Sequence, residues 1–174
     1  MISFADYCVK VERHIETAYG VRVITRDVPD PLTGDLNGAE IHVDYAVTPE
    51  QRLFLLVHLF GHTVQWNAVP GAFELGQPRQ PPVNEDCLPA LMEYEREAAR
   101  YALGLLHETG ITATDQWFAD YAACDEAYLR HYYLTGEKLE FLSFWRDGVA
   151  GIQAKPAPQF VPVLRSFRSD GVVI

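Results

Sequence analysis

The most restrictive feature of this sequence is the apolar run at residues 52–66, which reads RLFLLVHLFGHTVQW. A strong helix start comes just before it: Thr48 can cap the helix, Pro49 suits its first turn, and Gln51 completes a capping box. Because the run is hydrophobic almost all round, it predicts a helix buried at the centre of the fold rather than one lying on its surface.

Two histidines interrupt this apolar helix. His58 and His62 stand four residues apart, so both rings lie on one face, one turn from each other. Two imidazoles placed this way can bind one tetrahedral zinc ion at about 2.0–2.1 Å each. Buried ring nitrogens also need partners, and a metal satisfies two of them at once. The alternative is that each ring bonds a carbonyl or hydroxyl in the core.

A zinc ion needs a third protein ligand, often a carboxylate from elsewhere in the chain. The helix predicted at residues 91–106 offers Glu93, Glu95 and Glu97. Each of these, taken singly, could equally lie on a solvated helix face. Gly104, two turns beyond Glu97, predicts a close approach by a neighbouring helix.

The remaining elements predict an α+β fold. Residues 1–154 are expected to form a single domain, and residues 155–174 an extended tail broken by prolines. On the second strand, Ile41, Val43 and Tyr45 should share one face, with His42 pointing outward. The expected helices are 4–19, 91–106, 114–133 and a short one near 138–146; the strands are 21–25 and 39–47; the loops are 27–38 and 68–90.

Composition excludes several classes of protein. The formal net charge of -10 repels phosphate backbones, so we expect no nucleic-acid binding. No apolar run approaches the roughly 20 residues that a membrane span requires, and the N-terminus shows no signal-peptide pattern. The cysteines, Cys8, Cys87 and Cys124, are far apart and form no CxxC pair, which favours reduced thiols in the cytoplasm.

Two stretches carry a family resemblance. Residues 38–66 read GAEIHVDYAVTPEQRLFLLVHLFGHTVQW, and residues 97–106 read EAARYALGLL. Together they resemble the ImmA/IrrE family of zincin-like metallopeptidases, in which a strand, a loop and a strand precede a helix carrying His-Glu-x-Gly-His. His58, Gly61 and His62 match the first, fourth and fifth positions of that motif. The resemblance covers roughly residues 1–110 and implies a zinc ion held by His58, His62 and Glu97, with Glu93 as the spare.

The chain departs from the family at one position. Leu59 stands where the family has its catalytic glutamate, and losing such a general base typically costs roughly 10²–10⁴ in rate. Glu93 is a conceivable substitute base, as are Asp86 or Glu85, or a tyrosine or His131 near the ion, although no spacing supports any of them.

The resemblance therefore implies a zinc-binding, metallopeptidase-like protein whose peptide-bond hydrolysis is weakened or lost. A protein or peptide would bind along the sheet edge as an added strand. The alternative is a pseudoenzyme, a non-catalytic regulatory or protein-interaction module on the same scaffold.

Overall fold

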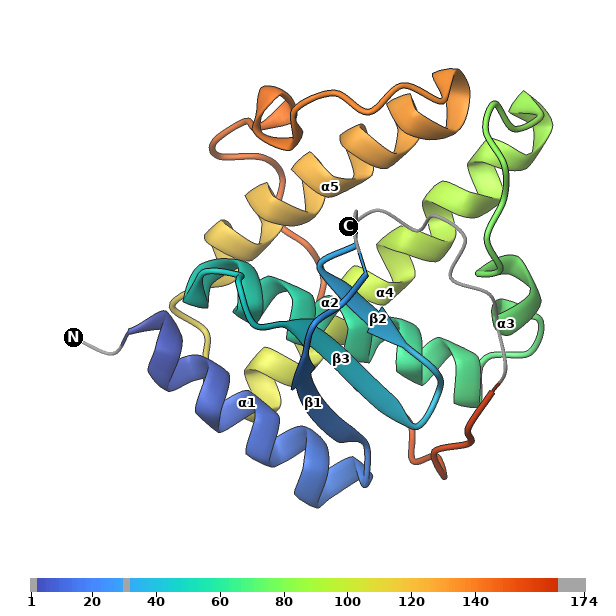
Figure 1. The fold of residues 1–174 in the computed structure, drawn as a ribbon. Coiled ribbons are helices and arrows are strands. Elements are labelled where there is room, and N and C mark those ends of the chain that lie inside the picture. Colours follow the sequence, from blue (N-terminus) through green and yellow to red (C-terminus); the bar gives the residue numbers. More distant parts are fainter. Residues whose placement is uncertain (1–2, 30–31, 166–174) are drawn as a thin grey trace.

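The computed structural model describes residues 3–29 and 32–165 and has an α+β fold, in which a small sheet and several helices surround one central helix (Figure 1). The predicted fold class is confirmed at this level. In chain order, the elements are α1 (Phe4–Tyr19), β1 (Arg22–Arg26), β2 (Gly34–Leu36), β3 (Glu40–Asp44), α2 (Pro49–Ala68), α3 (Ala72–Leu75), η1 (Glu85–Cys87), α4 (Leu88–Glu108), α5 (Asp115–Thr135) and η2 (Phe141–Phe144).

The sheet has the strand order β1-β3-β2, with β1 parallel and β2 antiparallel to β3. Ile41 and Val43 on β3 are fully buried, as the alternation predicts. Tyr45 lies just beyond the strand in a turn and is 69% exposed, so its predicted place beside them is wrong. His42 belongs to the opposite face, but it is buried there and contacts Glu40.

Strand β2 lies inside the segment predicted to be a loop, residues 27–38. Its three residues, Gly34 to Leu36, are flanked by turn formers and are too few to show an alternating pattern. Pairing with β3 therefore defines this strand, and sequence periodicity does not. Gly34 brings β2 close to the central helix: a Cβ there would lie 2.9 Å from Cδ1 of Leu59.

Helix α2 is the central element. Thr48 and Gln51 form the predicted capping box, and every residue from Leu53 to Trp66 is buried. The helix contacts β2 and β3 as well as α1 and α4. A Cβ on Gly61 would lie 2.2 Å from the carbonyl oxygen of Ala98, so α2 and α4 approach closely because this position has no side chain.

The described part of the C-terminal tail packs against the body of the protein. The backbone N–H of Lys155 donates to the carbonyl of Arg100, and that of Arg165 donates to the carbonyl of Asn37. A Cβ on Gly104 would lie 2.1 Å from the carbonyl oxygen of Lys155. The segment that packs closely against Gly104 is therefore the extended tail. The prediction that a neighbouring helix packs against Gly104 is wrong. Residues 166–174 of the predicted tail lie outside the described residues.

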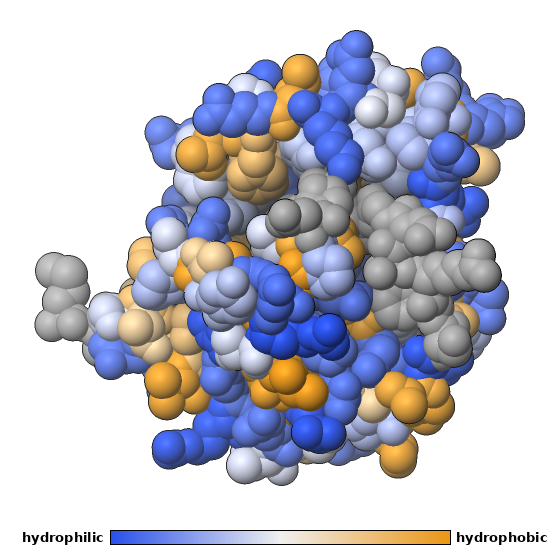
Figure 2. Space-filling view, viewed as in Figure 1, coloured by the Kyte–Doolittle hydropathy of each residue, from blue (hydrophilic) through white to orange (hydrophobic). Residues whose placement is uncertain are grey.

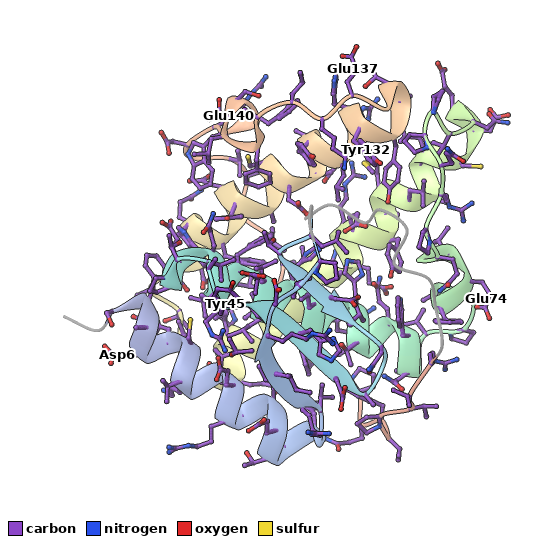
Figure 3. All side chains as sticks on the ribbon, viewed as in Figure 1. Asp6, Tyr45, Glu74, Tyr132, Glu137 and Glu140 are labelled. Carbon is purple, nitrogen blue, oxygen red and sulfur yellow. The ribbon has the colours of Figure 1, made fainter. Side chains whose placement is uncertain are left out.

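The face that carries the sheet mixes polar and apolar residues. Figure 2 shows hydrophobic residues scattered among hydrophilic ones on the face that carries the sheet. In Figure 3 the labelled side chains of Asp6, Glu74, Glu137 and Glu140 lie near the rim of the molecule. Within residues 3–29 and 32–165, no helix combines the length and the hydrophobicity needed to cross a membrane.

Candidate metal centre

Helices α2 and α4 bring three donor side chains together. The Nε2 atoms of His58 and His62 are 3.1 Å apart, as the spacing on one helix face predicts. Oε2 of Glu95, on α4, lies 3.1 Å from Nε2 of His62 and 3.5 Å from Nε2 of His58. Within the described residues, His58, His62 and Glu95 form the group suited to hold a metal ion, called the metal group below. The sequence thus predicts the histidine pair, but the carboxylate comes from a different glutamate.

The spacing of these atoms matches a zinc site. Ligands at 2.0–2.1 Å from a tetrahedral ion lie about 3.3 Å from one another, and the three observed separations of 3.1, 3.1 and 3.5 Å bracket that value. The site is also shielded from water, because the side chains of His58, His62 and Glu95 are 4%, 8% and 11% exposed. Two imidazole nitrogens and one carboxylate oxygen are a donor set that zinc binds well.

The two imidazole rings are held in fixed orientations. The His58 ring stacks on Phe54 with centroids 5.2 Å apart, and the His62 ring stacks on Tyr94 at 4.6 Å. The two histidine rings are nearly perpendicular, at 89°. This packing directs both Nε2 atoms toward Glu95 without a rearrangement of the core.

Gln65 fixes the tautomer of His62. Its Nε2 donates to the carbonyl of Tyr94 at 2.8 Å and to Glu97 at 3.1 Å, so its Oε1 is the atom that faces Nδ1 of His62, at 2.9 Å. An amide oxygen only accepts, and Nδ1 must therefore carry the proton. In the neutral ring the lone pair of Nε2 then points to His58 and Glu95, which is the arrangement that a metal ligand needs.

Glu97 does not belong to the group, and its predicted role as third ligand is not what the structure shows. One carboxylate oxygen accepts from Nζ of Lys155 at 2.7 Å, and the other accepts from Gln65. Successive helical residues are about 100° apart, so positions 95 and 97 point to different sides of α4. Glu97 instead accepts a hydrogen bond from Gln65, and Oε1 of Gln65 in turn accepts one from Nδ1 of His62.

The sequence did contain a signal for Glu95. This glutamate is three residues after Met92 and four before Ala99, and both belong to the apolar stripe of the predicted helix. Met92 and Ala99 are buried, at 2% and 6% exposed. A carboxylate on a buried stripe must be paired or bind a cation, and this argument singles out Glu95 among the three glutamates.

Burial and neighbouring side chains shift the pKa values of His58 and Glu95. Burial, followed by the neighbouring His62, lowers the pKa of His58 to about 3. Burial acts to raise the pKa of Glu95, but the protonated form of His62, through its charge and its hydrogen bond to Glu95, together with His58 outweighs burial, and the pKa is lowered. His58 therefore stays neutral and Glu95 ionised at neutral pH, which are the protonation states that a metal requires.

The predicted substitute bases lie elsewhere. The Glu93 side chain is 56% exposed and pairs with Arg100, so its predicted role as a base finds no support in its position. Glu85 and Asp86 are exposed on η1, and His131 bonds Thr135 near the end of α5. Leu59 is 1% exposed and borders a small pocket together with His58, His62 and Glu95. Position 59, beside His58, is thus filled by a hydrocarbon side chain.

A larger cavity, of about 470 Å³, lies between α4 and α5 and is bordered by His58, Glu95 and Asp125. Asp125, on α5, is a residue that the sequence analysis missed. Its side chain is 2% exposed, and its Oδ2 lies 3.8 Å from Nε2 of His58. Burial, with the charges of Glu95 and Glu126, raises the pKa of Asp125 well above its usual value.

Comparisons of this chain with protein-family models, with curated proteins and with solved structures found no match.

Proposed function

We propose that this protein binds one zinc ion through His58, His62 and Glu95. The observation that carries the proposal is the convergence of three ligand atoms, all within 4.8 Å of one another, from two helices in a buried site. The alternative of satisfied core histidines fits less well, because the Nε2 atoms of both rings face each other and Glu95 rather than a separate carbonyl or hydroxyl for each ring. A bound dication would also neutralise the buried charge of Glu95.

We further propose that the chain is a zincin-like protein of the ImmA/IrrE type in which peptide-bond hydrolysis is weakened or lost. The helix-borne histidines, Gly61 at the helix contact and a carboxylate from the following long helix support this proposal. When bound, zinc supplies a Lewis acid. Leu59 supplies no proton acceptor beside it, so the arrangement suits metal binding better than turnover.

The second candidate is a non-catalytic regulatory or protein-interaction module on the same scaffold. The buried Leu59 favours it, because a hydrophobic side chain fills the position beside the metal group. A protein or peptide partner, bound at the sheet edge, remains the proposed ligand in both cases. The free thiols of Cys8, Cys87 and Cys124 support a reducing compartment such as the cytoplasm.

A zinc titration of chelator-treated protein tests the proposal. We expect saturation at one zinc per chain, and at least about 100-fold weaker binding for Glu95→Gln, which removes a direct ligand. The matched control is Glu97→Gln on the same helix, where a loss of only about 10-fold is expected because Glu97 acts through Gln65. Equal losses in the two variants would contradict the assignment of the third ligand, and no saturable binding by the wild type would contradict the metal site itself.

Metal analysis of protein purified without added metal should be run in parallel, covering iron and manganese as well as zinc. Two histidines and a carboxylate also occur in non-haem iron sites. Peptidase assays on casein-derived peptides should then show little or no zinc-dependent cleavage by the wild type. Robust cleavage would mean that another residue replaces the missing base.

A further inference from the structure

A second buried carboxylate faces the metal group from α5. Asp125 is 2% exposed, its Oδ2 lies 3.8 Å from Nε2 of His58, and its Oδ1 has no hydrogen-bond partner among the described residues. Buried carboxyl oxygens are nearly always paired, since leaving one unpaired is costly. The position of Asp125 therefore calls for a partner that the described protein atoms do not provide.

The contact of Asp125 with His58 is not the usual support for a metal-binding histidine. Such supporting carboxylates accept from the ring nitrogen that points away from the metal. Asp125 instead faces Nε2, the nitrogen that also faces His62 and Glu95. It consequently lies on the metal side of the His58 ring.

The distance is close to that expected for a ligand. Atoms bound to one tetrahedral ion are about 3.3 Å apart, and Oδ2 of Asp125 exceeds this separation from His58 by about 0.5 Å. Asp125 lies outside the set of ligand atoms that are within 4.8 Å of one another, so ligation requires its side chain to rotate toward His62 and Glu95 when the ion binds. The cavity of about 470 Å³ that Asp125 borders leaves room for this rotation.

Charge favours the same arrangement. Glu95 and Asp125 are two buried carboxylates that both lie near Nε2 of His58. Two ionised carboxylates would repel each other in a site shielded from water, whereas one dication bound by both would bring the net charge of the group to zero. His58 and His62 add neutral nitrogen donors.

We propose that Asp125 is the fourth protein ligand, which closes a His58–His62–Glu95–Asp125 site around the metal ion. This inference rests on the proposed zinc site. Zinc sites with four protein ligands are structural, whereas catalytic ones keep a position open. In a closed site beside Leu59, no coordination position of the metal would be open to a substrate carbonyl. The scaffold would then serve as a metal-stabilised binding module.

The test is a zinc titration of the full chain carrying Asp125→Asn, which preserves the shape of the side chain. We expect zinc binding at least about 10-fold weaker than in the wild type. The control, Glu126→Gln, removes a carboxylate from the next residue, which borders the same cavity but pairs with Arg96. It should change zinc binding by no more than about twofold. Circular dichroism of each metal-free variant verifies that it is folded.

A second measurement reports on the open position directly. With Co²⁺ in place of zinc, the visible spectrum of the wild type should not change on addition of azide, because no position is free. In Asp125→Ala the spectrum should change, since azide can take the vacated position. A wild-type spectrum that responds to azide, or unchanged zinc affinity in Asp125→Asn, would overturn the fourth ligand while leaving the three-ligand site intact. Absence of binding by the wild type would overturn both.

Discussion

Gly61 sets the distance between the two helices that carry the proposed metal site of His58, His62 and Glu95, and Gly61→Ala should therefore disturb both stability and metal binding. The added Cβ would lie 2.2 Å from the carbonyl oxygen of Ala98, whereas ordinary contacts begin near 3.4 Å. Helix α4 must therefore recede by about 1.2 Å at this point. The neighbour is backbone, so no side chain can move aside.

The size of both effects follows from this displacement. Overpacking a close contact of this kind costs about 1–3 kcal/mol, and each 1 kcal/mol lowers Tm by roughly 2–4 °C in a protein of this size. Glu95 lies three residues before Ala98 on the same helix. A similar shift would move its carboxylate from 3.1 Å to roughly 4 Å from His62, beyond the spacing of shared ligands. Zinc affinity should then fall by at least about 10-fold.

Thermal unfolding followed by circular dichroism, and zinc titration of the same samples, measure the two effects. Gly151→Ala is the matched control, because a Cβ there meets nothing within 4 Å; it should leave both quantities essentially unchanged. If Gly61→Ala melts and binds zinc as the wild type does, the close approach of α2 and α4 does not position the site.

Two further predictions concern the pH dependence of stability and the replacement of Leu59. Burial, then His62, lowers the pKa of His58 from 6.5 to about 3. As the pH falls, His58 takes up a proton in the unfolded chain before it does so in the folded protein. His58 should therefore leave the free energy of unfolding of the metal-free protein unchanged above pH 6.5. Below pH 6.5 that free energy should fall by up to about 1.4 kcal/mol per pH unit. Denaturant unfolding between pH 6.5 and 5 should show a shallower dependence in His58→Gln, and an unchanged slope would refute the shift. Leu59→Glu alone should remain without peptidase activity, whereas Leu59→Glu with Asp125→Ala should gain zinc-dependent cleavage of casein peptides; activity in the single variant would argue against a closed site.

Local patterns in the sequence predict the central helix and its histidine pair correctly. The capping box at Thr48 and Gln51 and the apolar run after it depend on neighbouring residues alone, and α2 begins and is buried as expected. His58 and His62 meet because helix geometry fixes residues four apart on one face.

The choice of Glu95 as the proposed third ligand depends on information that local patterns do not hold. Glu95 and Glu97 belong to one helix, and which of them faces His62 depends on how α4 is rotated against α2. The contact of Gly61 with the backbone of Ala98 helps to set that rotation. The resemblance to the ImmA/IrrE family implies Glu97 as the third ligand, whereas the apolar stripe through Met92 and Ala99 favours Glu95.

Other differences between prediction and structure arise from long-range contacts. Strand β2 exists through its pairing with β3, and Asp125 reaches the site because α5 packs on α4. Lys155, predicted only as the start of a tail, forms an ion pair with Glu97 and so supports Gln65 and His62. None of these contacts has a signature in the spacing of nearby residues.

Zinc K-edge X-ray absorption of the zinc-loaded protein tests the central claim most directly, because it identifies the atoms bound to the ion. The account predicts two imidazole nitrogens and carboxylate oxygens at about 2.0–2.2 Å, with no sulfur at about 2.3 Å. The imidazole signal should be lost in a variant carrying both His58→Ala and His62→Ala. A spectrum dominated by sulfur, or one without imidazole scattering in the wild type, would contradict it.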